Sequence, residues 1–349
     1  MTCLCRKCAE FVSTAAVRFD PMTTDGAVLC CPDKFRGTLT AREAAAALAT
    51  GARRAGREAI ELPLADGGEG TLDVLCPGVT QRITVRVTGP LGEPVEAEWG
   101  LRDETAVVEM ARASGLALVA ANDPLAATTR GTGELIREAL DAGARRVIVA
   151  VGGSATTDGG LGALEALDFD LRGAEVEVAC DVTTRFVDAA RVFGPQKGAT
   201  RGAVELLERR LERLAERYRA KTGRDVRGLA GGGAAGGLAG GLAALGATLV
   251  PGAPLVADLL GVRARLRSST LVLTGEGRLD ATSFSGKVVG HVLADAESAV
   301  VPASVIAGTV VRDELPPGVN ARSLVEWAGA ERAHACAAAL LAEIAAELC

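Results

Sequence analysis

The sequence predicts an α/β protein with about two domains. Twice near the start of the chain, a short apolar run is followed by a polar, glycine-containing loop and then by a helix-forming segment, which is the order typical of α/β sheets. The chain has 349 residues, whereas a single domain commonly has ~150. Hydrophobic residues make up 48% of the chain and charged residues 23%, which excludes a disordered, coiled-coil or collagen-like protein.

The first of these units begins with a strand expected at residues 27–31. Thr40, with Glu43 three residues later, forms a capping box, in which the side chain of each residue accepts a hydrogen bond from the backbone N–H of the other. The box predicts an alanine-rich helix that ends near Gly56. A second strand is expected at residues 59–64 and leads into the second polar loop.

Short alternating segments follow, and they predict a β-meander beyond a domain boundary near Cys76. Its strands are expected at residues 83–87, 95–99 and 105–109. One helix is expected at residues 131–142, opened by Thr132 and Glu134, and another at residues 202–221, where apolar residues form a single stripe. Further buried strands are expected at residues 146–151, 175–180, 271–274 and 304–307, before a final alanine-rich helix.

Residues 228–257 carry no charge, and the segment exceeds the ~20 residues that a helix needs to cross a membrane. Its many glycines and two prolines argue against a membrane span, because large apolar side chains are few. A buried helix of small residues, or a glycine loop leading into one, is expected instead.

The charge and the aromatic content exclude several classes of partner. A net charge of −6 and a pI near 5.3 predict no general attraction to nucleic acid or to an anionic membrane. Aromatic residues make up only 3% of the chain, too few for a surface that stacks single-stranded bases. With His291 and His334 as the only histidines, a mechanism that needs several imidazoles is also excluded.

The cysteines predict a reducing compartment. Nine cysteines, an odd number in a long chain, favour free thiols and a cytoplasmic protein. Cys5 and Cys8 form a CxxC pair, but neither a second pair nor a neighbouring histidine completes a metal site. Residues 1–21 lack the apolar segment of a signal peptide and are expected to be a disordered tail or a misassigned start.

Charged side chains follow five of the expected strands. In open parallel sheets, ligands bind outside the carboxyl ends of the strands. Carboxylates at several equivalent positions, beside glycines that leave backbone N–H groups free, indicate a site for phosphate and Mg²⁺; structural turns are the alternative. The charged residues at these strand ends, together with one serine, are Asp33, Lys34, Asp66, Glu69, Ser154, Asp158, Asp181, Glu276, Arg278 and Asp280.

The common nucleotide-binding motifs do not match. The segment 281–288 resembles the end of a P-loop, but Ala281 stands in place of the first glycine and Val288 in place of the Mg²⁺-binding serine or threonine. The glycines of 231–236 have GxGxxG spacing, yet no strand precedes them. Lys197 lies between two glycines in a segment that is either a phosphate contact or a surface turn.

Eight segments together carry a family likeness. They are Cys31–Thr40, Ala65–Thr71, Gly131–Ile136, Gly152–Gly160, Ala179–Val182, Gly194–Ala199, Gly233–Gly237 and Thr274–Asp280. In sequence and in order, they resemble the motifs of the type 1 glycerate kinases over about residues 28–310.

The resemblance implies an ATP- and Mg²⁺-dependent kinase that phosphorylates D-glycerate, typically to 2-phosphoglycerate. It also implies a Rossmann-like parallel-sheet domain built from both chain ends, residues 22–75 and 266–349, and an inserted mixed α/β domain at 76–265, with the site in the cleft. The chain is shorter than the family pattern between Gly160 and Ala179 and differs from it over 281–291. A kinase of another hydroxy or sugar acid, or an inactive nucleotide or sugar-acid sensor, is therefore an alternative.

The resemblance, together with the needs of phosphoryl transfer, assigns expected roles. The transfer requires cations at the phosphates, carboxylates for Mg²⁺ and an acceptor for the hydroxyl proton. The expected catalytic residues are Asp181 or Asp66 as the base, Lys197 at the phosphates and Arg278 at the glycerate carboxylate. The expected nucleotide contacts are Lys34, Gly67, Gly68, Gly152, Gly153, Ser154, Gly275, Gly277 and Lys287, and the expected metal-linked residues are Asp158, Glu276 and Asp280. The alanine-rich carboxyl-terminal helices suit a homodimer or, equally, an intramolecular core.

Overall fold

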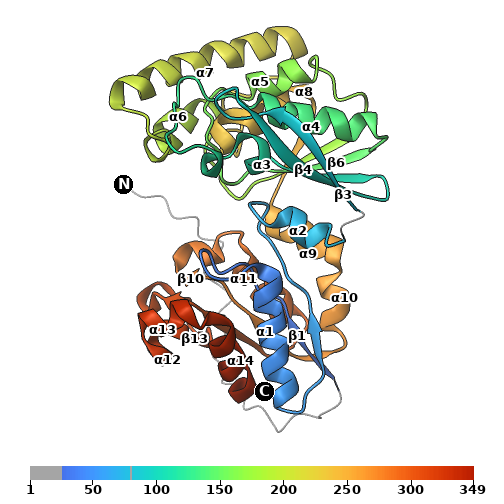
Figure 1. The fold of residues 1–349 in the computed structure, drawn as a ribbon, viewed down its shortest axis with the longest axis vertical. Helices are drawn as coiled ribbons and strands as arrows, with labels where there is room; N and C mark the ends of the chain where they lie inside the picture. The colour runs from blue at the N-terminus through green and yellow to red at the C-terminus, as the bar shows by residue number, and fades with distance from the viewer. Residues whose placement is uncertain (1–25, 79–80) are drawn as a thin grey trace, which may run out of the picture.

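The computed structural model describes residues 26–78 and 81–349, which form two helix-covered β-sheets (Figure 1). The blue start and the orange-to-red end of the chain lie together in the lower part of Figure 1, while the green and yellow middle forms the upper part. The predicted α/β fold class, with a parallel sheet built from both chain ends, is confirmed. The expectations for residues 1–21 and for the Cys5–Cys8 pair lie outside the described residues.

The first sheet has five strands, all parallel, in the order β13-β11-β9-β1-β2. Its strands are β1 (Ala27–Cys30), β2 (Ala59–Glu61), β9 (Ser269–Thr274), β11 (Ala303–Ala307) and β13 (Ala321–Ser323). The chain passes from β1 to β2 on one side and from β9 to β11 on the other, so the winding direction reverses between β1 and β9. At such a reversal a crevice opens outside the carboxyl ends of the strands, which places the residues after Cys30 and Thr274 at a binding position.

The predicted capping box begins the first helix, α1 (Ala41–Arg54). The Glu43 N–H donates to Thr40 Oγ1, and the Thr40 N–H donates to the Glu43 carboxylate. The final helix, α14 (Ala337–Leu348), packs against α1, so its small-residue face serves a core within the chain. The other helices of this half are α2 (Thr71–Leu75), α9 (Gly252–Leu260), α10 (Val262–Leu266), α11 (Val288–Ser298), α12 (Leu324–Ala328) and α13 (Ala330–Ala335), and a small parallel pair joins β10 (Arg278–Leu279) to β12 (Thr309–Val310).

The second sheet has six strands in sequential order from β3 to β8. The predicted meander forms its antiparallel part, and the pairs from β5 to β8 are parallel. The strands are β3 (Arg82–Thr88), β4 (Pro94–Arg102), β5 (Thr105–Glu109), β6 (Arg146–Ala150), β7 (Glu175–Ala179) and β8 (Thr248–Val250). Along β6, Val147 and Val149 enter one core and Ile148 another, because successive strand residues point to opposite faces.

One core lies between this sheet and the helices above it. Trp99, Phe186 and Tyr218 are among its largest fully buried side chains. The helices are α3 (Ala111–Ser114), α4 (Arg130–Asp141), α5 (Leu161–Ala166), α6 (Ala189–Phe193), α7 (Arg201–Thr222) and α8 (Leu238–Leu245). This core gives the carboxyl ends of β6 and β7 a rigid support.

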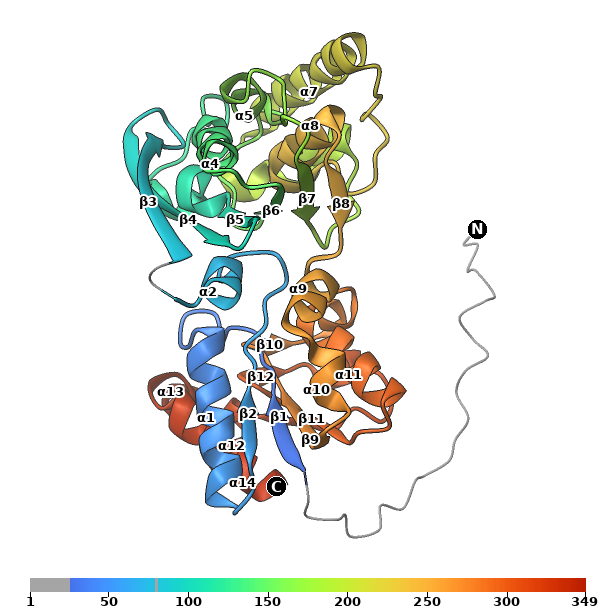
Figure 2. The same cartoon turned by 90° about the vertical axis from the view of Figure 1, so that its right-hand side faces the viewer.

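Helices α2 and α9 lie between the two sheets (Figure 2). Leu72 of α2 and Val256 of α9 share a buried cluster with Ile148 of the second sheet. Arg112, just after the second sheet's β5, adds an ion pair to Asp73 of α2 at 3.2 Å. The two halves are therefore joined by apolar packing and by charge, so the loops that face each other between them have a defined arrangement.

The uncharged segment at residues 228–257 folds as short elements. Within the described residues, no helix is long and apolar enough to cross a membrane; the uncharged segment forms the buried helix α8 and then β8, a strand that the sequence pattern did not predict.

The prediction that Thr132 and Glu134 open their helix is wrong. Helix α4 begins at Arg130, Thr132 donates to Ser114 Oγ, and Glu134 accepts from the backbone N–H of Thr88.

Candidate active site

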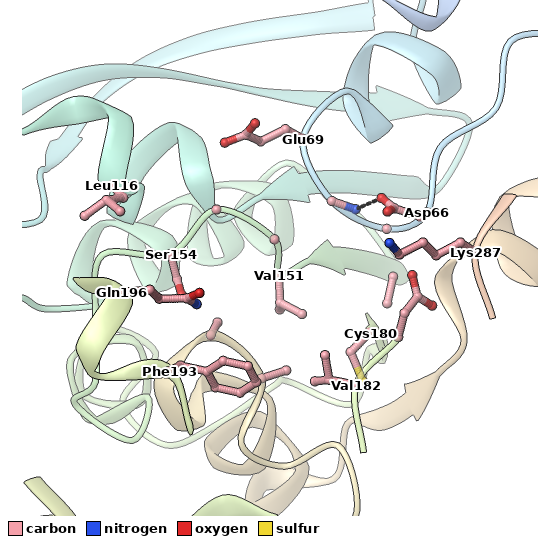
Figure 3. A pocket seen from close by; sticks show the side chains of 18 of the residues that line it. Asp66, Glu69, Leu116, Val151, Ser154, Cys180, Val182, Phe193, Gln196 and Lys287 are labelled. Atoms are coloured by element: carbon pink, nitrogen blue, oxygen red, sulfur yellow. Dashed lines mark hydrogen bonds between the residues drawn. The ribbon is translucent and has the colours of Figure 1, made fainter. Parts of the chain in front are cut away.

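A cavity of about 520 Å³ lies where loops from the two sheets face each other (Figure 3). Its walls come from the segments after β2, β6 and β7 and from the start of α11. Among the predicted site residues, those that line it are Asp66, Gly67, Gly68, Gly152, Gly153, Ser154, Asp181, Lys197 and Lys287. Residues that are far apart in the sequence thus meet at one cavity.

Lys34 connects two carboxylates at one side of this cavity. Its Nζ lies 3.7 Å from Asp33 Oδ1 and 3.8 Å from Asp66 Oδ1. Burial lowers the pKa of Lys34, but the two carboxylates outweigh that effect and raise it above its usual value. Burial also raises the pKa of Asp33, to about 6. This side of the site therefore combines a firmly protonated lysine with a carboxylate that is short of compensating charge.

A second cavity, of about 530 Å³, adjoins the first. Asp33 and Lys34 line it, and Arg36 and Glu69 line both cavities. The triad of Asp33, Lys34 and Asp66 therefore stands at the junction of two adjoining spaces.

Asp181 lies across from Asp66, directly after β7. Its Oδ1 accepts a hydrogen bond from the Gly252 N–H at 2.9 Å. Burial raises its pKa to about 7, and the negative charges of Asp66 and Asp33 add to that rise, while the Gly252 N–H and Lys287 oppose it. A carboxylate with a pKa near neutrality, in a cavity wall, can accept a proton from a bound hydroxyl group.

Glu276 and Lys287 flank the loop between β9 and α11. Burial raises the pKa of Glu276 to about 7, and its Oε1 is buried with no hydrogen-bond partner among the described residues. Lys287 precedes the first turn of α11, and its Nζ donates to Thr282 Oγ1 at 2.9 Å. The charge of Lys287 also acts on Asp33 and Asp181, so the loop takes part in the electrostatics of the cavity.

Lys197 is the most deeply buried cation of the cavity, with 3% of its surface exposed. Its Nζ donates to Ser154 Oγ at 2.8 Å and to the Thr156 carbonyl at 2.6 Å. Neither partner carries a charge, so burial lowers the pKa of Lys197 to about 7. A bound anion would supply the missing negative charge.

The glycine loops allow the two halves to touch. A Cβ on Gly152 would lie 2.8 Å from the Cα of Gly68, and one on Gly67 would lie 2.7 Å from the Ala179 Cβ. The Val151 N–H donates to the Gly67 carbonyl at 3.1 Å, across the same contact. These glycines are thus required by loop packing as well as being able to bring bare backbone to a ligand.

Two predicted residues at the other end of the β9–α11 loop do not line the cavity. The Arg278 side chain is 65% exposed and pairs with Asp280 at 3.0 Å. Asp280 Oδ1 accepts from the Thr282 N–H and so caps the 3₁₀ turn at Ala281–Phe284. The local turn therefore directs Arg278 to Asp280 and leaves it outside the cavity that the other predicted residues line. Among the glycines, Gly275 packs against the Ile306 carbonyl and Gly277 against Arg36, and neither lines the cavity.

Asp158 also has a different setting from the one predicted. It is buried, and its Oδ2 accepts from the N–H and Oγ1 of Thr129, both at 2.8 Å. The N–H groups of Gly160 and Gly162 complete its partners. The described residues contain no cluster of three or more potential metal ligands, so Asp158, Glu276 and Asp280 are not brought together as one.

We expect Asp158→Ala to destabilise the fold. Removal of the carboxylate would leave the buried N–H groups of Thr129, Gly160 and Gly162 without an acceptor, which should lower the free energy of unfolding by roughly 2–4 kcal/mol. Denaturant unfolding measures this, with the exposed Asp258→Ala in α9 as a control expected to change it by less than about 0.5 kcal/mol. Unchanged stability with an altered Mg²⁺ requirement would contradict the structural role.

Sequence reasoning assigned no role to several residues that line the cavity, of which three have side chains suited to binding a ligand. They are Arg36, Phe193 and Gln196. Arg36 and Gln196 lie in segments whose predicted ligand contacts are the nearby Lys34 and Lys197. That proximity was the only feature of the sequence that could have pointed to Arg36 and Gln196 as site residues. Arg36 is exposed and has no charged partner among the described residues.

Comparison with known proteins gives a consistent result. The model of the glycerate kinase family matches residues 28–175 and 168–349. A glycerate kinase of Bacillus subtilis (strain 168) is 40% identical over 329 residues, and a glycerate 2-kinase of Escherichia coli (strain K12) is 40% identical over 328; each alignment covers 82% of this chain and 86% of the relative. A crystal structure of a glycerate kinase 2 from Salmonella typhimurium LT2 superposes with a TM-score of 0.79 at 36% identity, covering 93% of this chain and 97% of the other.

Proposed function

The chain belongs to the glycerate kinase family, and from this we propose that it transfers the terminal phosphate of ATP to a hydroxyl group of glycerate, giving 2-phosphoglycerate. One observation carries the proposal. Asp66 and Asp181, from different halves of the molecule, line the same cavity as Lys197 and Lys287. Phosphoryl transfer depends on such positioning of cations and a proton acceptor around the reacting groups.

Asp181 is proposed as the base. Its carboxylate lines the cavity and has a pKa of about 7, so at neutral pH it can take the proton of the attacking hydroxyl group. Asp66 is not proposed as the base, because its carboxylate already has two partners. Its Oδ1 accepts a hydrogen bond from the Gly68 N–H at 3.1 Å and lies 3.8 Å from the Lys34 ammonium. Its proposed part is to hold Lys34 in place.

The lysines are proposed to stabilise the transferred phosphate. Among the described residues there are four lysines, and Lys34, Lys197 and Lys287 all lie at the two adjoining cavities, leaving only Lys221 elsewhere. Charged donors in a partly dry site stabilise the charge that spreads over the phosphate oxygens in the transition state. The backbone at Gly152 and Gly153 can add N–H donors.

Arg36, rather than Arg278, is proposed to hold the glycerate carboxylate. It lines both cavities where they join, next to Asp66 and Glu69. A guanidinium can bind a carboxylate through two parallel hydrogen bonds, which fixes the orientation of a small acid. The acid would then lie with a hydroxyl group within reach of Asp181.

The residues present fit a magnesium ion. The buried Oε1 of Glu276 has no partner among the described residues, and burial raises the pKa of both Glu276 and Asp33 by more than the nearby lysines lower it. Mg²⁺ commonly binds proteins through one or two carboxylates and completes its shell with phosphate oxygens and water. We propose that Asp33 and Glu276 hold it, directly or through water. When bound, it would neutralise charge on the phosphates of ATP.

A cytoplasmic location is also proposed. The six cysteines that the structure describes are all free, and Cys30, Cys31 and Cys76 are buried. Burial raises the pKa of these thiols, which keeps them in the unreactive form. Free thiols of this kind are typical of proteins in a reducing compartment.

The proposal is tested by measuring ADP release with D-glycerate, ATP and Mg²⁺, and by identifying the product by NMR. Turnover that depends on glycerate, yields 2-phosphoglycerate and stops when EDTA removes the metal is the expected result. Turnover only with other hydroxy or sugar acids would replace glycerate as the substrate. If a folded, Mg²⁺-supplied sample binds ADP in a calorimeter but turns over no acid, the chain is a sensor and not a kinase.

A further inference from the structure

One end of the 520 Å³ cavity is lined by apolar side chains that its charged end does not explain. Leu116 follows α3 and Phe193 ends α6, so two separate segments supply them. Both Leu116 and Phe193 are only partly buried. Phe193 also packs against the core of the second sheet, but its partly exposed side chain lines the open cavity. Apolar side chains that face an open cavity indicate a ligand with an apolar surface.

Two of the charged side chains lie at the opposite end of the same cavity. In Figure 3, Leu116, Phe193 and Gln196 lie on one side, while Asp66 and Lys287 lie on the other. Ser154, which accepts from Lys197, is on the side of Gln196. One end of the cavity therefore has apolar side chains next to the ammonium of Lys197, and the other end has Asp66 and Lys287.

We propose that the apolar end binds the base of the phosphate donor, with Phe193 against the face of the base and Gln196 at its edge. This inference rests on the proposed function and names the part of the site that selects the nucleotide. A nucleoside triphosphate offers a group to each end of the cavity, since it has a flat base at one end and a polyanion at the other. Glycerate has no apolar part, so it does not account for Phe193.

Gln196 provides a means of choosing between bases. Its side chain is exposed and lies beside Ser154 in the cavity. A carboxamide presents one acceptor and one donor side by side, which matches the N6 donor and N7 acceptor of adenine; guanine offers two acceptors, O6 and N7, on the same edge. Gln196 should therefore favour adenine over guanine nucleotides.

The first test measures binding of ADP by calorimetry, without glycerate and without turnover. Phe193→Ala is expected to raise the Kd for ADP about tenfold or more, the usual effect of losing an aromatic contact to a base. Phe193→Leu keeps an apolar side chain that packs on the core and should give a smaller increase. Val192→Ala, at a neighbouring position that is 46% exposed and does not line the cavity, is the matched control and should bind as the wild type does.

The second test compares nucleotides. Gln196→Leu should reduce the preference for ADP over GDP by about tenfold, as expected when a base loses its paired hydrogen bonds. In steady-state assays of Phe193→Leu, the KM for ATP should rise while the KM for D-glycerate stays unchanged.

The outcomes separate this inference from the proposed function. If the wild type phosphorylates glycerate but Phe193→Leu and Phe193→Ala bind ADP as tightly as the wild type, the base lies elsewhere and the kinase assignment still stands. A rise in the KM for glycerate alone would place the acid at the apolar end and overturn the inference. If ADP binding depends on Phe193 but no acid is turned over, the base site is supported and the kinase activity is not.

Discussion

Asp181→Asn is expected to lower kcat by about 10²–10⁴-fold, the range typical for the loss of a general base. Asparagine keeps the shape of the side chain and can still accept a hydrogen bond from the Gly252 N–H, so the fold should be retained. It cannot take the proton of the attacking hydroxyl group. ADP release with D-glycerate measures the effect, and Asp103→Asn, at an exposed turn between β4 and β5, serves as the control.

The pH dependence of the same reaction follows from the raised pKa of Asp181. The base must be ionised to work, and the pKa of about 7 is that of the ligand-free protein, so kcat/KM of the wild type for D-glycerate should fall as the pH drops below about 7 and should level off above it. Glu276 has its pKa raised to about 7 as well, so the comparison with the variant is what identifies the group. The low residual rate of Asp181→Asn should lose the part of this dependence that belongs to Asp181. Retained activity in Asp181→Asn with a large loss in Asp66→Asn would instead make Asp66 the base.

Lys197→Met should lower kcat by about 10²–10³-fold, as is common when a donor to the charge of a transition state is removed. The ammonium of Lys197 is held by Ser154 and the Thr156 carbonyl at the cavity wall, where methionine fills a similar volume without a charge. The change is measured as ADP release, and Lys221→Met, on the exposed part of α7, is the control.

The same substitution should change stability with a definite sign. The pKa of Lys197 is about 7 in the folded protein, whereas the ordinary value of 10.5 applies to the unfolded chain, so between these values the unfolded chain binds the extra proton. Stability of the wild type therefore increases as the pH rises from about 7 to 10.5, and below pH 7 the fold bears the full cost of burying the charge. Lys197→Met removes that cost, so its melting temperature relative to the wild type should be higher at about pH 6 than at about pH 10. An equal difference at both pH values would contradict the buried-charge interpretation.

Local patterns predicted the elements that depend on neighbours in the sequence. The Thr40–Glu43 capping box forms as expected, because its partners are three residues apart and their geometry is set by one turn of helix. The strands of the meander also form, since their alternating side chains fit a half-buried sheet. The three-residue strands β8 and β13 were missed, because so short a segment becomes a strand only through its pairing with a distant one.

The residues of the site also divide into those with local partners and those whose position depends on distant segments. Asp158 and Asp280 occupy strand ends, as Asp66 and Asp181 do, yet the first two bond to the N–H groups of nearby turns and the second two line the cavity. An acidic residue beside glycine fits either role, so its sequence pattern cannot distinguish them. What distinguishes them is whether the opposite half of the molecule lies across from the carboxylate.

The α/β class, most helices and strands, the family motifs and the charged residues from which a phosphate site could be built were all predictable from local sequence patterns. Which of these residues meet depends on the folded arrangement. Folding sets Asp66 opposite Asp181, buries Lys197, turns Arg278 towards Asp280 and adds Arg36 and Phe193 to the cavity. The reason is physical. Helix caps and strand alternation arise from contacts within a few residues, whereas a cavity between two sheets depends on the packing of α2 and α9, which joins segments that lie more than a hundred residues apart.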